Sequence, residues 1–114
     1  MDIAAKQIGD VAVVELPVEE LDDSNAADLK RDMAPVLDSY VKVALGLRRL
    51  RFIDSSGLGA FLSCLRKLNA KGGDLKLYGM SKQVRAVFEL VRMHRIFEIC
   101  GTQEEAVHAF ERKS

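Results

Sequence analysis

The sequence is poor in cysteine, in histidine and in net charge. Its 114 residues include two cysteines and two histidines, and 17 basic and 17 acidic side chains cancel. Proteins that bind nucleic acid or membrane surfaces in general are usually visibly basic, so neither partner is expected. No apolar run approaches the roughly 20 residues of a membrane helix. The N-terminus lacks the basic start and apolar run of a signal peptide, so we expect a cytoplasmic protein.

The few residues capable of catalysis or metal binding do not form a known pattern. Cys64 and Cys100 fall on apolar patterns without Cys-x-x-Cys, which favours reduced core cysteines over a disulfide or a zinc site. His94 and His108 have no evident catalytic partner. Neither a Gly-x-Ser-x-Gly motif nor a Walker or complete dinucleotide motif is present. We therefore predict no metal, no cofactor and no enzymatic activity.

What is present indicates one compact α/β domain over residues 1–114. The apolar fraction of 48% is sufficient for a real core. Strands and helices are predicted to alternate, which implies a largely parallel sheet with right-handed crossovers. The expected strands are 8–16, 41–47, 74–78 and 96–99, with a further strand over 3–7, and the expected helices are 26–40, 57–71, 82–91 and 103–110.

Several residues refine this pattern. Pro35 is expected to kink the helix over 26–40 or to end it near Ala34, because proline removes a hydrogen bond. Ser81 and Thr102 are predicted N-caps. The expected core residues are Leu45, Leu47, Ile53, Phe61, Leu62, Leu65, Val87 and Phe88.

A short polar corner separates the buried strand ending near Leu50 from the helix expected over 57–71. It consists of Asp54, Ser55, Ser56 and Gly57. Asp and Ser side chains accept hydrogen bonds from the free N–H groups of a helix start. The corner also presents two hydroxyls at a helix N-terminus, where negative charge is tolerated. From local chemistry alone, a simple helix cap is favoured over a phosphorylation site.

The stretch Phe52-Ile53-Asp54-Ser55-Ser56-Gly57-Leu58-Gly59 resembles the most recognisable segment of the anti-sigma-factor antagonist family, the small STAS-domain proteins. The resemblance extends from Val11 to Phe110 as an order of strands and helices. It implies an α/β, STAS-like fold, a small and mostly parallel β-sheet with helices packed mainly on one side.

The same resemblance implies a regulatory binding function. In this family the serine directly after the aspartate, here Ser55, is phosphorylated by a serine kinase that is also the anti-sigma factor. Unphosphorylated, the chain would bind that partner and free a sigma factor for transcription, and a PP2C-type phosphatase would restore this state. Ser56 is expected to be the structural cap, although the sequence leaves the reverse assignment open.

A partner-binding surface is expected around this corner. Asp22 in Leu21-Asp22 matches a family aspartate whose loop lies near the phosphorylation corner, and a helix-start cap is an equally good role for it. Asp54 would cap or support the corner, while glycines there allow close approach of another protein. The expected partner-binding residues are Asp22, Asp54, Ser56, Gly57, Leu58 and Gly59.

Two departures from the family pattern and two alternative functions remain. Gly46 replaces the usual polar residue of the central strand, which suggests a bend or a close approach there. Arg48, Arg49 and Arg51 form a basic cluster, predicted to be a solvated loop or a partner for phosphate.

The first alternative function is a STAS module of a transporter complex or signalling scaffold that does not act on sigma factors. The second, an enzyme or nucleotide-binding protein, lacks a visible phosphate loop.

Overall fold

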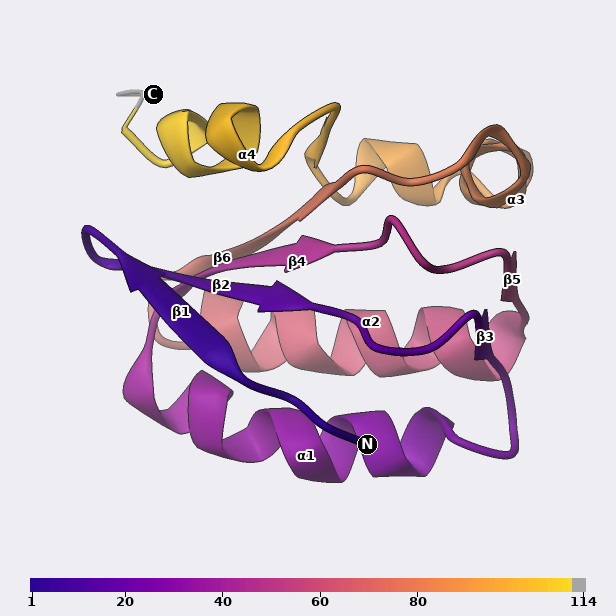
Figure 1. Cartoon of the computed structure of the whole chain (residues 1–114), viewed down its shortest axis with the longest axis horizontal. Helices are drawn as coiled ribbons and strands as arrows, with labels where there is room; N and C mark the ends of the chain where they lie inside the picture. Colours follow the sequence, from indigo (N-terminus) through magenta and orange to yellow (C-terminus); the bar gives the residue numbers. More distant parts are fainter. Residues whose placement is uncertain (112–114) are drawn as a thin grey trace.

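The computed structural model describes residues 1–111, and its centre is a five-stranded sheet in the order β1-β2-β4-β6-β7 (Figure 1). The antiparallel pair β1–β2 is followed by parallel pairings across the rest of the sheet. This confirms the predicted, mostly parallel sheet. The strands are β1 Ala5–Ile8, β2 Val11–Glu15, β4 Lys42–Gly46, β6 Asp74–Tyr78 and β7 Ile99–Cys100.

The helices divide the core into a large and a small part. Helices α1 (Ala26–Ser39) and α2 (Ser55–Asn69) cover one face of the sheet, and α3 (Lys82–Leu90) contributes Val84 and Phe88 to the same buried cluster. Helix α4 (Gln103–Ala109) packs on the opposite face over a smaller cluster. Most helical packing is therefore on one side, as predicted. No helix within residues 1–111 combines the length and apolar character needed to cross a bilayer.

Two predicted strand boundaries are wrong. The run over 8–16 is interrupted by Gly9, whose φ of 61° makes a tight turn, so Ile8 ends β1 and pairs with Val11 at the start of β2. The strand expected over 96–99 begins only at Ile99, because a 3-10 turn η1 (Met93–Arg95) precedes it. The N–H of Ile96 donates to the Met93 carbonyl and continues that turn.

Of the two outcomes expected at Pro35, a kink or an early end of the helix, the early end is wrong, because α1 continues to Ser39. Proline removes one N–H donor from a helix interior. The turn after it is held by the burial of Val36 and Leu37 and by a hydrogen bond from the Tyr40 N–H to the Val36 carbonyl at 3.0 Å. Tertiary packing therefore compensates for the missing bond.

Candidate functional site

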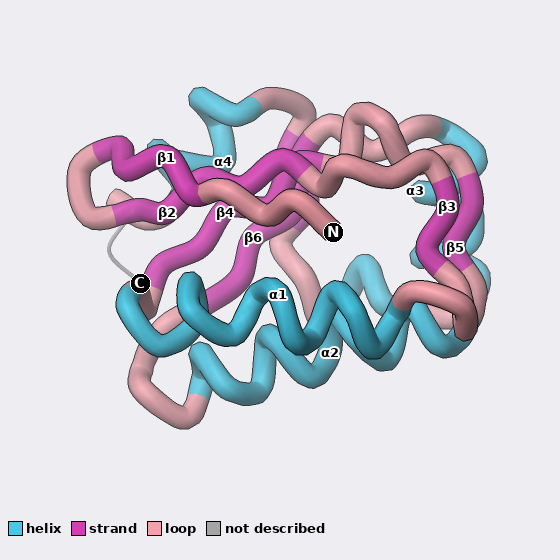
Figure 2. The backbone as a smooth tube through the Cα atoms, turned by 60° about the horizontal axis from the view of Figure 1, so that its bottom comes forward, coloured by secondary structure: helices cyan, strands magenta, loops and turns pink. Residues whose placement is uncertain are grey.

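A second, very small sheet builds the site. Strands β3 (Glu20–Leu21) and β5 (Phe52–Ile53) pair in parallel, with Leu21 opposite Ile53. The N–H of Asp54 donates to the Leu21 carbonyl at 3.2 Å. Asp22 therefore follows β3 as Asp54 follows β5, and the two loops lie side by side (Figure 2). This confirms that the Asp22 loop lies beside the Ser55 corner.

Helix α2 begins at Ser55, two residues earlier than predicted. Asp54 is its N-cap, in an extended conformation, and its Oδ1 accepts a hydrogen bond from the Gly57 N–H at 3.1 Å. The prediction that Asp54 caps the corner is confirmed, and the prediction that Ser56 is the cap is wrong. The physical reason is position, since the cap must directly precede the first helical residue.

The two serines differ in exposure. Ser55, the first helical residue, is exposed, and Ser56 is half-buried. Neither hydroxyl makes a hydrogen bond within residues 1–111, so the Ser55 hydroxyl is accessible for modification without breaking an existing contact. A phosphate there would lie at the positive end of the α2 dipole.

Gly57 and Leu58 are buried parts of the corner. A Cβ on Gly57 would lie 2.8 Å from both the Leu21 carbonyl oxygen and Ile53 Cγ1, so glycine is required for α2 to approach the small sheet. Leu58 is in the core. Gly59 is exposed and has open space around it. The glycine at position 57 thus serves close packing within the chain, and Gly59 remains available for close approach of a partner.

The Asp22 loop is fixed by its own polar side chains. Asp22 Oδ1 accepts hydrogen bonds from the N–H and the hydroxyl of Ser24, at 2.9 and 2.5 Å, and these bonds lower the pKa of Asp22. Asn25 accepts from the Asp22 N–H and donates to the Glu20 carbonyl. Asn25, rather than Asp22, occupies the N-cap position of α1, without a side-chain cap bond. Asp22 is therefore a charged, ordered residue beside the corner.

Sequence reasoning missed the elements that join the two loops. Strands of two residues carry no periodicity, so nothing in the sequence predicted β3 or β5 as a pair. The Glu19 carbonyl, which accepts hydrogen bonds from the N–H groups of Arg51 and Phe52, was missed for the same reason. Asn25 carried a signal, because Asn before an apolar periodic run is typical of a helix start.

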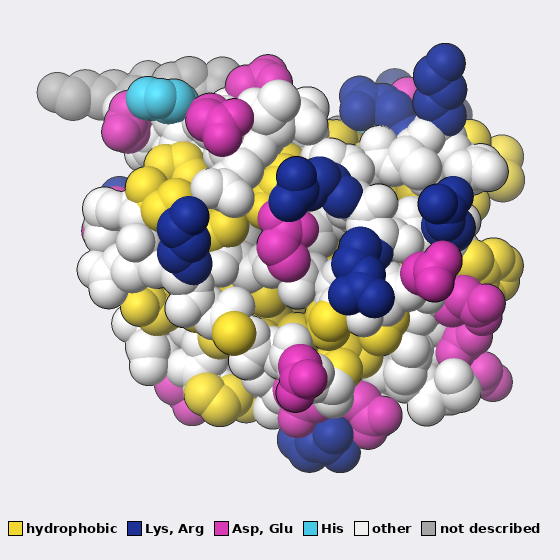
Figure 3. Space-filling view, in the orientation of Figure 1, with side chains coloured by type: hydrophobic (Ala, Val, Ile, Leu, Met, Phe, Trp, Pro, Cys, Tyr) yellow, Lys and Arg dark blue, Asp and Glu magenta, His cyan; other side chains and the backbone are white. Residues whose placement is uncertain are grey.

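Two of the three arginines before the corner are paired with carboxylates, so the three do not form a free basic patch. Arg48 pairs with Glu15 at 3.0 Å, and Arg51 pairs with Glu19 at 3.4 Å. Arg49 is exposed and makes no ion pair within residues 1–111. Positive and negative side chains are interspersed on the face shown in Figure 3, in line with the zero net charge. Pairing of these arginines with a phosphate stays a prediction.

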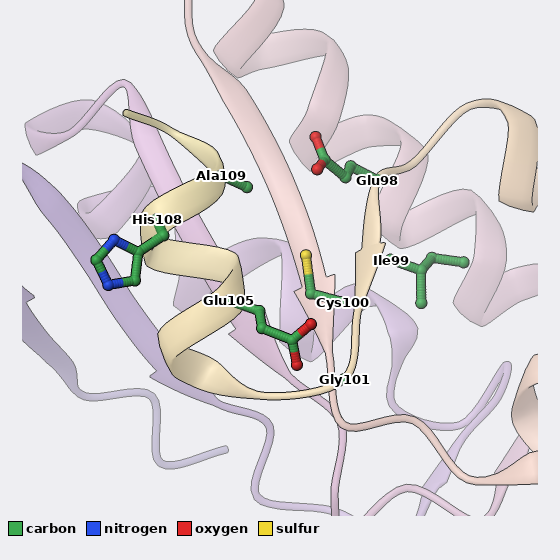
Figure 4. A pocket seen from close by; sticks show the side chains of 7 residues that line it. All are labelled: Glu98, Ile99, Cys100, Gly101, Glu105, His108 and Ala109. Atoms are coloured by element: carbon green, nitrogen blue, oxygen red, sulfur yellow. The ribbon is translucent and has the colours of Figure 1, made fainter. Parts of the chain in front are cut away.

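A surface hollow of about 440 Å³ lies away from this corner between β7 and α4 (Figure 4). Cys100, Glu105 and His108 are among its lining residues. Within residues 1–111, no group of three His, Cys, Asp or Glu side chains is arranged to hold a metal ion. Burial raises the pKa of the Cys100 thiol, which disfavours a reactive thiolate.

Comparisons with known proteins agree with this architecture. The STAS domain family model matches residues 2–106. BtrV of Bordetella bronchiseptica, a candidate anti-sigma factor antagonist, is 33% identical over 92 residues, covering 80% of this chain and 79% of that protein. The crystal structure of a candidate anti-sigma factor antagonist from Thermotoga maritima superposes with a TM-score of 0.87 at 28% identity, covering 96% and 95% of the two chains.

A third comparison shows the fold alone. SpoIIAA of Bacillus in its phosphorylated form has a TM-score of 0.70 at 24% identity, covering 96% of this chain and 99% of that one. Taken with the family match, these findings show that the chain belongs to the STAS domain family. Its relatives in the comparison are proteins named as anti-sigma factor antagonists.

Proposed function

We propose that this chain is an anti-sigma factor antagonist that is switched by phosphorylation of Ser55. Unphosphorylated, it binds an anti-sigma factor that is also a serine kinase, and in doing so frees a sigma factor. The observation that carries the proposal is the exposed Ser55 hydroxyl at the first position of α2, beside the Asp22 loop. The names of the relatives and the phosphorylated form of SpoIIAA support it.

The geometry favours Ser55 over Ser56 as the modified residue. A kinase must reach the hydroxyl oxygen, and Ser55 is exposed whereas Ser56 is half-buried. The Asp54 carboxylate is already bound to the Gly57 N–H, so it keeps the start of α2 in place while Ser55 is modified. Asp22, Asp54, Ser56 and Gly59 form the accessible part of the proposed partner surface.

Phosphorylation would change binding without unfolding the domain. A phosphate adds about −1.5 to −2 charges and three strong acceptors, and the N–H groups at the start of α2 offset its cost in the free chain. Against a docked partner the same charge must be desolvated or matched. A loss of about 1.4 kcal/mol already reduces affinity tenfold, so the switch needs no refolding. A PP2C-type phosphatase would reverse the modification in the cytoplasm.

The experiment that tests the proposal uses the purified chain and anti-sigma factor kinases of its source organism. We expect Ser55→Ala to bind such a kinase as tightly as the parent and to resist phosphorylation with ATP. Ser55→Asp should bind at least about tenfold more weakly while melting within a few degrees of the parent. Calorimetry, thermal melting and mass spectrometry of the phosphorylated residue measure these quantities.

Ser56→Ala is the matched control and should be phosphorylated normally. If Ser55→Ala is still phosphorylated stoichiometrically and Ser56→Ala is not, the modified residue is Ser56 and the assignment to Ser55 is wrong. Binding of Ser55→Asp with parental affinity would remove charge exclusion as the mechanism. If no kinase of this class binds the chain, the proposed function fails as a whole.

A further inference from the structure

Large apolar side chains are exposed where α3 leads into β7. Leu90 is 83% exposed, Val91 46% and Ile96 52%, and these are three of the five exposed large hydrophobic residues among residues 1–111. They fall within seven consecutive residues, whereas single exposed apolar residues are ordinary and scattered. We call Leu90, Val91, Arg92, Arg95 and Ile96 the Leu90 surface. These exposed side chains are not covered by any element within residues 1–111.

The folding of α3 does not require these side chains to be apolar. Val84 and Phe88 bury the inner face of the helix, and Phe88 packs against Phe61 of α2 with ring centroids 6.3 Å apart. Leu90 lies two positions after Phe88, on the opposite side of a helix with 3.6 residues per turn. An apolar residue on that side gains nothing from the core, so its exposure calls for another explanation.

Arg92 is held in a conformation that arginine adopts at a cost. Its φ is 62°, and it is the only non-glycine residue with positive φ among residues 1–111. Glycine fits this left-handed position after a helix without the Cβ penalty. Arg92 and Arg95 are both exposed and make no ion pair within the described chain. Two cations without an ion pair therefore lie between the exposed Val91 and Ile96 in the sequence.

The Leu90 surface lies at the same end of the molecule as the Ser55 corner. Helix α3 contacts β5, and Phe52 of β5, two residues before Asp54, is itself 52% exposed. Figures 1 and 2 both show α3, β3, β5 and the start of α2 gathered at this end, and Figure 3 shows hydrophobic side chains along its edge. A partner seated on the corner can therefore reach α3.

We propose that the Leu90 surface is a second contact area for the same anti-sigma factor kinase, and that it fits an apolar strip of that partner flanked by carboxylates. This inference rests on the proposed function. Charge complementarity favours such a partner, because carboxylates would pair with Arg92 and Arg95 while apolar side chains cover Leu90 and Ile96. A symmetric contact of the Leu90 surface with that of a second copy would instead supply no carboxylate to Arg92 or Arg95, because the five residues of this surface include none.

Site-specific photo-crosslinking in the source cells tests this assignment. A photoreactive phenylalanine analogue is placed at Leu90, at Phe52 as a reporter of the corner, and at Val41 as a control. Val41 is also exposed, at 40%, but it directly precedes β4, at the end of the molecule opposite to β5. We expect the analogues at positions 90 and 52 to crosslink to the same protein, the kinase that phosphorylates Ser55. The analogue at position 41 should crosslink to no protein.

The outcomes separate the two proposals. Crosslinking of the kinase at Phe52 but not at Leu90 overturns this inference and leaves the proposed function standing. Crosslinking at Leu90 to a second copy of the chain, to lipid or to another protein also overturns it. If neither position joins a kinase, both proposals fail together.

Two variants test the contact in solution with the purified kinase. Leu90→Ser and Arg92→Gly should each weaken binding, by roughly tenfold if the residues are central to the contact, whereas Val41→Ser should bind like the parent. Arg92→Gly should also raise the melting temperature, because glycine relieves the left-handed backbone. Weaker binding by a more stable variant cannot result from unfolding. Parental affinity of both variants would overturn the proposal.

Discussion

Gly46 ends β4 where a larger residue has no room. A Cβ at this position would lie 2.6 Å from the Cζ and hydroxyl oxygen of Tyr78 and would also clash with the Glu15 carboxylate. The Tyr78 ring is buried, and its hydroxyl donates to Glu15 Oε1 at 2.5 Å, so it cannot easily move aside. The sequence predicted a close approach at Gly46 but could not identify its cause, because Tyr78 is 32 positions away. The structure therefore favours packing, rather than partner contact, as the reason for this glycine.

Replacing Gly46 with alanine should destabilise the domain by about 1–3 kcal/mol, the usual cost of overpacking. Gly59 provides the matched control, since it lies in α2 with open space around it. Gly59→Ala should stabilise the domain by up to about 1 kcal/mol, because alanine is the better helix former. Urea unfolding of both variants measures the difference. Equal shifts in the two midpoints would show that Gly46 is not packed as described.

Tyr78 should make stability depend on alkaline pH. Burial, followed by its hydrogen bond to Glu15, raises the pKa of the Tyr78 hydroxyl well above its ordinary value. The folded chain therefore holds this proton more tightly than the unfolded chain, whose tyrosines ionise near pH ~10. The contribution is complete below that pH and is lost as the pH rises above it. Urea midpoints measured from pH 8 to 11 should fall less steeply for Tyr78→Phe than for the parent, and parallel curves would contradict this.

At the scale of elements, the sequence predicted the order of strands and helices better than their ends. Asp54, Ser55 and Ser56 are all good cap residues, so sequence reasoning could not choose among them, and tertiary contacts decided. Packing of Gly57 against Leu21 and Ile53 sets the direction of α2 and makes Asp54 the residue that precedes it. The Ser55 corner was thus predicted, whereas its attachment through β3 and β5 was not.

Substitution of Asp54, the N-cap of α2, tests how this helix begins. Asp54→Ala should lower the free energy of unfolding by about 1 kcal/mol, because the Gly57 N–H loses its acceptor. Ser56→Ala should change it by less than about 0.5 kcal/mol, as for a surface substitution without a special contact. Chemical denaturation of the two variants compares them directly. A larger loss of unfolding free energy for Ser56→Ala than for Asp54→Ala would show that Ser56, and not Asp54, caps the helix.

At the scale of the whole molecule, hydrophobic periodicity predicted most of the core. Six of the eight predicted core residues are buried, while Leu62 and Val87 are half-buried at the edge of the larger cluster. Periodicity gives the inward face of a helix but not where the neighbouring element stops covering it. The same limit applies to α3, where the apolar pattern leaves Leu90 on the outer face without saying what covers it.

Leu65 tests the register of α2 against the sheet. It is 4% exposed in the larger cluster, so Leu65→Ala should cost roughly 2–5 kcal/mol through lost burial and a cavity. The half-buried Leu62 on the same helix is the control, and Leu62→Ala should cost less. Denaturation midpoints report both values. A parental midpoint for Leu65→Ala would mean that α2 packs with a different face.

The pairing of β3 with β5 spans only two residues on each strand and lies outside the five-stranded sheet. So short a ladder can open locally at far lower free energy than the central strands, which share long pairings with their neighbours. Under the proposed function, the Ser55 corner could therefore shift on binding its partner while the central strands of the five-stranded sheet stay paired.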